Sequence, residues 1–239
     1  NDCEGSLHAD AFILPAAHSP EEMIAKYRNR ASGQFFYGAD YVVLSEQARQ
    51  MAETAKVTKK YPNKICISTG GSDPEGIMIG ILKALSQKRF QNFTIKALPG
   101  SNFMHEKALN RLIPELPPEI EISRFNMKDF TDTQCAFTTF GVLSYELIHA
   151  GIPLLSTAHA LPNATGSKNM EQRCKCLKDL GMFKNLTTGV ILKEFDAFIR
   201  DRELQEFLKK NAEQLIDGKG AQRTAQIQAS LLSGNLYKI

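Results

Sequence analysis

From residue 64 onward, short apolar runs alternate with segments of helical periodicity, and turn-forming residues separate them. The apolar runs predict buried strands at 64–69, 93–98, 120–122, 135–138 and 153–156. The intervening periodicity predicts a helix that starts at Asp73, followed by helices at 105–112, 127–131, 141–150, 168–180, 202–216 and 221–232. Strands that alternate with helices form a parallel sheet covered on both faces, and right-handed crossovers make it doubly wound. The pattern therefore predicts an α/β, Rossmann-like domain.

Residues 1–60 break this rhythm. Strands are predicted at 10–14 and 41–44, an amphipathic helix at 20–30, and the lysine-rich stretch 56–63 is typical of a linker. The region is too short and too poor in strands to form a second Rossmann domain. We therefore divide the chain into a residual amino-terminal domain segment with its linker at 1–60 and a Rossmann-like domain with C-terminal helices at 61–239.

The charge balance argues against two classes of partner. The 239 residues carry 29 Lys and Arg against 26 Asp and Glu, a net charge of +3. Nucleic-acid and membrane-surface binders concentrate basic residues on one face, so neither partner is expected. No apolar run approaches the roughly 20 residues of a transmembrane helix, and the polar start Asn1-Asp2-Cys3-Glu4 differs from a signal peptide. We therefore expect a cytoplasmic protein without a membrane span.

Five cysteines, an odd number, are scattered along the chain. Cys66 and Cys135 lie inside apolar runs, which predicts that they are small buried hydrophobic residues. Cys174-x-Cys176 lacks the second ligand pair that zinc-finger spacing requires. We expect reduced thiols, as in a cytoplasmic protein, and the sequence predicts neither a metal site nor a bound cofactor.

The segment that follows the first of these strands, Thr69-Gly70-Gly71-Ser72-Asp73-Pro74, has the chemistry of an anion site. Two glycines let the backbone approach a ligand closely, and a helix N-terminus offers free N–H groups with positive partial charge. The alternative is a tight turn in which Asp73 only caps the helix. The loop is neither a P-loop nor a full dinucleotide fingerprint, because the required glycine and lysine spacing is absent.

A second loop, Thr138-Thr139-Phe140-Gly141, leads into an apolar helix that contains Glu146. A carboxylate among apolar residues is costly unless it has a partner, and at this distance from a phosphate site it could take both hydroxyls of a ribose. The alternative is a Glu that faces solvent. Ligands of open parallel sheets bind beyond the carboxyl ends of the strands. We therefore expect strands 64–69 and 135–138 to be neighbours, with Gly70 and Gly141 at one sheet edge.

At these two loops the chain resembles a known family. It is similar to the carboxyl-terminal nucleotide-binding domain of the spore-coat polysaccharide biosynthesis and pseudaminic-acid sugar-nucleotide hydrolase family, which has the glycosyltransferase B architecture. The matching segments are 67–74, Asn126-Met127, Phe140-Gly141 through Tyr145-Glu146-Leu147 with 151–153, and the interdomain pattern Gly38-x-x-Tyr41-x-x-Leu44. The resemblance covers roughly residues 36–182.

The resemblance implies a role for each matched position. Gly70, Gly71 and Ser72 would face the diphosphate of a nucleotide sugar, Phe125, Asn126 and Met127 would border the base, Gly141 would lie in the second phosphate loop, and Glu146 would bind the ribose. Many relatives have Gly-Gly-Ser-Thr where this chain has Phe140-Gly141-Val142-Leu143, so two hydroxyls are lost. Relatives also carry Asn-Gln at the start of the following helix, where Asn169 or Gln172 could correspond.

The family's catalytic base is a His in a Gly-x-Gly-His segment of the amino-terminal domain, and this sequence has no such segment. His8 and His18 lie in the front region, where a His without an orienting partner is usually structural or exposed. His159 follows the fifth predicted strand and lies nearer the expected ligand. The catalytic residue is therefore unknown.

The resemblance implies binding of a UDP- or CMP-type nucleotide sugar for hydrolysis or glycosyl transfer in cell-surface glycan biosynthesis. Enzymatic activity would need an amino-terminal domain in the parent protein. The alternative is a non-catalytic nucleotide-binding or interaction module that has lost the catalytic half. Val142, Leu143 and the missing His segment favour that alternative, whereas the glycine loop and Glu146 favour retained binding.

Overall fold

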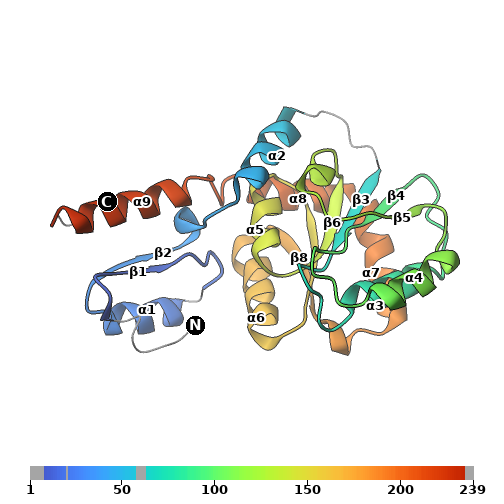
Figure 1. The fold of residues 1–239 in the computed structure, drawn as a ribbon, viewed down its shortest axis with the longest axis horizontal. Helices are drawn as coiled ribbons and strands as arrows, with labels where there is room; N and C mark the ends of the chain where they lie inside the picture. Colours follow the sequence, from blue (N-terminus) through green and yellow to red (C-terminus); the bar gives the residue numbers. More distant parts are fainter. Residues whose placement is uncertain (1–7, 20, 58–62, 235–239) are drawn as a thin grey trace.

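The protein is described by a computed structural model that covers residues 8–19, 21–57 and 63–234. Its centre is a six-stranded, fully parallel sheet in the order β5-β4-β3-β6-β7-β8 (Figure 1). The strands are β3 (Lys64–Ser68), β4 (Thr94–Ala97), β5 (Ile120–Ile122), β6 (Cys135–Thr139), β7 (Leu154–Ala158) and β8 (Leu177–Met182). The predicted doubly wound, Rossmann-like sheet is confirmed. So is the predicted central pairing, because β3 lies beside β6.

Two apolar clusters cover the two faces of this sheet, because successive side chains of a strand point to opposite faces. Ile65 and Ile67 point into the cluster formed with α3 (Ile77–Leu85), α4 (Glu106–Leu112) and α7 (Thr188–Arg200). Cys66, between them, belongs to the cluster formed with α2 (Glu46–Val57) and α5 (Val142–His149). Helices α6 (Leu161–Asn169) and α8 (Arg202–Ala212) complete the set around the sheet. The parallel strands are therefore buried on both sides.

The front of the chain forms a small unit of its own. Strand β1 (Ala11–Leu14) pairs in parallel with β2 (Gln34–Tyr37), and α1 (Glu21–Arg30) connects them. The last helix, α9 (Gly220–Leu232), leaves the large sheet and lies along this unit (Figure 1). There Ile227 forms a third apolar cluster with Phe36 and Tyr41. The division at residues 60 and 61 stays a prediction, but the described C-terminal helix packs on the first part of the chain.

Two local predictions were wrong. The predicted helix at 168–180 is instead the end of α6, a π-helical turn at Met170–Cys174, and strand β8. Lys175, with φ 52°, ends the helical turn in the left-handed region, and Leu177 then pairs with Leu154. The predicted strand at 41–44 is instead a 3-10 turn at Ala39–Tyr41 followed by irregular backbone, and the strand of this region is β2.

The predicted linker at 56–63 stays a prediction. Helix α2 extends to Val57, so the helical part of the chain reaches into that stretch, and residues 58–62 lie outside the described residues. Helix α7 was not predicted at all. Its apolar stripe includes Ile191, Phe195 and Phe198, which are buried against the sheet.

The loop after β3 is held by the loop after β4. The amide of Asn102 donates to the carbonyl of Gly71 at 3.0 Å, and the amide of Met104 donates to the carbonyl of Ser72 at 3.0 Å. Gly100 allows this contact, because a Cβ there would lie 2.4 Å from the carbonyl oxygen of Gly70 and 2.5 Å from that of Gly71. The two loops are therefore fixed as one unit.

We predict that Gly100→Ala lowers the free energy of unfolding by about 1–3 kcal/mol, because backbone atoms must move to admit the methyl group. Urea denaturation followed by circular dichroism measures the change. Gly189→Ala is the matched control: a Cβ at Gly189 in α7 meets no atom within 4 Å. That control should be neutral or stabilising by about 0.5–1 kcal/mol. Equal unfolding midpoints for the two variants would contradict the tight contact.

Candidate functional site

A cavity of about 950 Å³ opens where β3 to β7 end. It lies over the β3–β6 pair, where the strand order reverses, which is the place where open α/β sheets bind ligands. Most of the predicted site residues line it: Gly70, Gly71, Ser72, Phe125, Met127, Gly141, Glu146 and His159. The structure therefore brings the two loops together, as the sequence predicted. Asn126 and Asn169 are not among the lining residues.

The glycine loop differs from its prediction in how it meets α3. The helix begins at Ile77 rather than near Asp73, and the buried Asp73 carboxylate occupies its N-terminus. Its two oxygens accept hydrogen bonds from the amides of Ile77 and Met78, both at 2.8 Å, and from the Thr69 hydroxyl at 3.0 Å. These helix amides are therefore unavailable to an external anion.

The loop itself still offers donors. Gly70 has φ 86°, a backbone conformation that favours glycine. A Cβ at Gly71 would meet nothing within 4 Å, so its backbone is open to the cavity. Within the described part of the chain, no hydrogen bond occupies the amides of Gly71 and Ser72. An anion can therefore approach these amides rather than those of the helix.

The second loop presents a free helix terminus. Gly141 caps α5 with an extended backbone, and its amide donates to the Ser144 hydroxyl at 3.3 Å. The first amides of a helix have no hydrogen-bond partner inside that helix. None of the described residues accepts a hydrogen bond from the amides of Val142 and Leu143. Val142 is 70% exposed and lines the cavity. Val142 and Leu143 lack the two hydroxyls that many relatives have at these positions. The backbone N–H donors and the positive end of the helix dipole remain.

Glu146 is buried, with 7% of its surface exposed, so the alternative of a solvent-facing carboxylate is wrong. Its Oε1 accepts from the Ser45 amide at 3.2 Å and from the Ser45 hydroxyl at 2.7 Å. Ser45, directly before α2, and Gln47, in the first turn of α2, line the same cavity. Sequence reasoning missed both residues. The available signal was that Ser45 directly precedes Glu46, the first residue of α2. Serine is a favoured residue at the N-cap position of a helix.

Neither Asn169 nor Gln172, the two candidates for the amide of the helix after β7, lines the cavity. Both lie at or beyond the end of α6, away from the lining residues. Asn163, in the first turn of α6, lines the cavity and donates to the carbonyl of Phe140 at 2.9 Å. Pro162 near the start of that helix was the signal that could have placed it.

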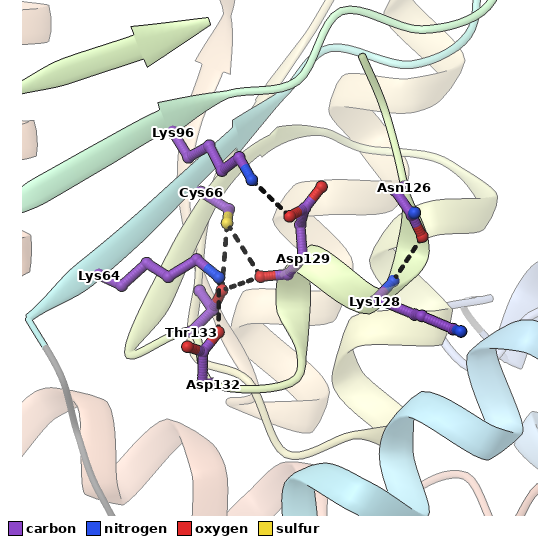
Figure 2. A network of polar contacts seen from close by, with 8 residues as sticks. All are labelled: Lys64, Cys66, Lys96, Asn126, Lys128, Asp129, Asp132 and Thr133. Atoms are coloured by element: carbon purple, nitrogen blue, oxygen red, sulfur yellow. Dashed lines mark hydrogen bonds and ion pairs between the residues drawn. The ribbon is translucent and has the colours of Figure 1, made fainter. Parts of the chain in front are cut away.

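A polar network fixes the wall that carries Phe125 and Met127 (Figure 2). The Lys96 ammonium of β4 pairs with Asp129 at 2.6 Å, and Lys64 of β3 pairs with Asp132 at 2.5 Å. These acids belong to or follow the 3-10 turn Met127–Phe130, so both pairs hold that turn against the sheet.

Two further residues of Figure 2 have structural roles. Asn126 caps the 3-10 turn, because its Oδ1 accepts from the Lys128 amide at 3.0 Å. The Cys66 sulfur lies 3.1 Å from the Thr133 hydroxyl, and burial raises the pKa of this thiol to about 11. Cys66 and Cys135 are both buried, as predicted, and Cys3 lies outside the described residues.

Within the described residues, no acid orients a histidine as it would in a catalytic group. His8 is exposed, and His159 is an exposed residue at the cavity. The His18 Nδ1 lies 2.5 Å from the Tyr145 hydroxyl, and its ring meets Phe140 edge-on at 5.4 Å between centroids. Burial lowers the pKa of His18 and raises that of Tyr145. His18 thus joins the front unit to α5 behind the cavity wall.

The cavity is lined by charged side chains of both signs. Arg124, after β5, is the one Lys or Arg among the lining residues in the described part of the chain. Glu106, Glu146 and the buried Asp73 also line the cavity. Among residues 8–19, 21–57 and 63–234, no group of three His, Cys, Asp or Glu side chains could hold a metal ion. Every helix in those ranges is too short or too polar to cross a membrane.

Solved structures show what this architecture is similar to. Acinetobacter baumannii MurG superposes with a TM-score of 0.66 at 15% identity, over 91% of this chain and 65% of that one. The S. aureus MnaA–UDP co-structure gives 0.66 at 13% identity, over 98% and 65%. CalG4, the calicheamicin glycosyltransferase, gives 0.59 at 14%, over 93% and 52%. Together with the six parallel strands, this likeness defines a Rossmann-like domain of the glycosyltransferase B type.

Among curated proteins, the spore coat polysaccharide biosynthesis protein SpsG of Bacillus subtilis (strain 168) is 26% identical over 204 residues. The match covers 83% of this chain and 59% of SpsG, so the chain spans less than two thirds of that protein. No family model matches the sequence. The likeness to SpsG agrees with the glycosyltransferase-like resemblance of the two loops, and it does not extend to a hydrolase activity.

We predict that the free energy of unfolding falls as the pH decreases below about 6.5, the ordinary pKa of His. Because the folded-state pKa of His18 is lowered, the unfolded chain binds a proton that the folded chain resists. This loss continues until the pH reaches the folded-state pKa, and the stability is fully present above 6.5. Urea denaturation at several pH values between 8 and 5.5 measures the slope of the free energy of unfolding against pH.

His18→Asn keeps an acceptor for Tyr145 but cannot titrate in this range, so part of the slope should disappear. The control is His8→Asn, which changes an exposed histidine and should leave the slope intact. An equal slope in wild type and His18→Asn would show that the buried position of His18 beside Tyr145 does not disfavour protonation of His18.

Proposed function

We propose that the chain binds the nucleotide portion of a UDP- or CMP-type nucleotide sugar and acts in cell-surface polysaccharide biosynthesis. The observation that carries the proposal is the meeting of two donor loops with a buried carboxylate in one cavity at the switch point. MnaA was solved with UDP, and SpsG is a polysaccharide biosynthesis protein, which supports the same chemistry for this chain.

The phosphates would lie between the amides of Gly71 and Ser72 and the N-terminus of α5. Backbone N–H groups and a helix dipole stabilise phosphate charge without a metal ion. Gly141 gives the second loop no side chain in this space, and its Cβ position meets nothing within 4 Å. Arg124 supplies the positively charged side chain of the cavity.

The base and ribose would occupy the side of the cavity near α2. Phe125 and Met127 offer apolar surface to the base, and the network beneath them keeps that wall rigid. Glu146, in the neighbouring α5, would accept hydrogen bonds from the ribose hydroxyls. In this proposal Asn126 supports the wall through its cap rather than by touching the base, and Asn163 takes the place first given to Asn169.

The reaction would be hydrolysis or glycosyl transfer in the cytoplasm, with a base supplied by an amino-terminal domain of the parent protein. The second candidate is a nucleotide-binding module without catalysis. The absence of an acid-oriented histidine among the described cavity residues favours it for this chain in isolation. Binding and turnover are therefore tested separately.

We predict that UDP binds the purified chain and that Glu146→Gln weakens this binding by about 1–3 kcal/mol, the scale of a lost charged hydrogen bond. Pyrophosphate binding should change far less, because pyrophosphate has no ribose. Isothermal titration calorimetry measures both affinities. The matched control is Glu75→Gln, which removes the same charge from an exposed residue outside the cavity lining. Equal losses for UDP and pyrophosphate would exclude the ribose role of Glu146.

We also predict that this chain alone does not turn over nucleotide sugars at a steady rate. A catalytic base must lie about 2.6–3.2 Å from the proton it takes, directly or through one water, and His159 is exposed without an orienting partner among the described residues. Release of free sugar from UDP- and CMP-sugars is the measurement. Steady turnover that His159→Ala abolishes would make this chain a complete enzyme and reject the prediction.

A further inference from the structure

The carboxylate proposed to bind ribose is held by one residue from outside the Rossmann sheet. Glu146 Oε1 receives two hydrogen bonds from Ser45, from its amide at 3.2 Å and from its hydroxyl at 2.7 Å. A buried carboxylate is costly unless hydrogen bonds compensate its lost hydration. Within the described residues, Glu146 forms no salt bridge. Ser45 therefore provides the hydrogen bonds that keep this carboxylate in place.

These two bonds also orient the carboxylate. A carboxylate oxygen accepts about two hydrogen bonds, so Ser45 saturates Oε1. No hydrogen bond from the described residues reaches Oε2, and Glu146 lines the cavity. The unoccupied oxygen has room for the two neighbouring hydroxyls of a ribose.

The Ser45 hydroxyl is itself fixed. It donates to Glu146 and accepts from the Ala48 amide at 3.2 Å, as the N-cap of α2. Both its hydrogen and a lone pair are thus committed, which leaves the side chain little rotational freedom. Helix α2 packs against α5 and the 3-10 turn Met127–Phe130, on the side proposed for the nucleoside. A binding group held by a second layer of hydrogen bonds is preorganised for its ligand.

We propose that Ser45 is the positioning residue that makes this cavity selective for ribonucleotides over deoxyribonucleotides. It acts through Glu146, whose free oxygen it turns toward the 2′- and 3′-hydroxyls. The inference rests on the proposed function, since it assumes that a nucleotide occupies the cavity. It adds that the segment before β3, and not the Rossmann sheet alone, sets the sugar preference of the site.

The test compares UDP, 2′-deoxy-UDP and pyrophosphate by isothermal titration calorimetry. Wild type should bind UDP about 10–150-fold more tightly than 2′-deoxy-UDP, the equivalent of one hydrogen bond to a charged group. Ser45→Ala should reduce this preference to about threefold or less. Ser45→Thr keeps the hydroxyl and should retain the wild-type preference. Pyrophosphate affinity should be the same in all three proteins.

Thr187→Ala provides a matched control for the loss of a helix cap. Thr187 caps α7 by accepting from the Val190 amide at 3.3 Å, and it does not line the cavity. This variant should keep the full preference for UDP. A full preference in Ser45→Ala would overturn the positioning role while leaving the proposed function intact. If wild type does not bind UDP, the proposed function fails and this inference fails with it.

Discussion

The parallel pairing of β3 with β6 is the constraint on which the site depends. These strands are far apart in the sequence, yet Ile65 lies opposite Cys135 and Ser68 opposite Thr138. Their carboxyl ends therefore stop side by side, and the loops that follow turn to opposite faces of the sheet. Because β4 lies outside β3 and β7 outside β6, the helices diverge from this point and leave a space between the loops. The amides of Gly71, Ser72 and the start of α5 reach the cavity from this divergence, and Ser45 reaches it from the start of α2.

Local sequence patterns predicted β3 to β7 well, because each of these strands is a short apolar run with a turn residue after it. The same patterns failed where packing decides the structure. Residues 168–180 have helical periodicity, but the edge of the sheet beside β7 recruits Leu177 to Met182 as a strand. At the front, Gln34–Tyr37 forms the strand rather than 41–44, since it is this stretch that pairs with β1. Tertiary pairing overrides a local preference in both places.

The candidate site shows a similar division. Glycines and a carboxylate in an apolar helix were visible in the sequence, and Gly70, Gly71, Gly141 and Glu146 share one cavity. The partners of these groups were not visible, because they come from distant segments. No spacing rule connects Ser45 to Glu146, which are 101 residues apart, and the competition of Asp73 for the start of α3 depends on a positive φ of 45°.

Because α9 packs on the front unit but follows the large sheet in the sequence, the order of synthesis determines when the front unit is completed. Phe36 and Tyr41 precede the large sheet in the chain, whereas Ile227, which completes their cluster, follows it. Chains are produced from the N-terminus, and apolar surface exposed during synthesis is prone to wrong contacts. The apolar side chains Phe36 and Tyr41 of the front unit therefore lack Ile227 as a partner while the large sheet is synthesised. The apolar surface of the front unit is therefore covered only after the whole sheet, which lies between its two parts in the sequence, has been synthesised.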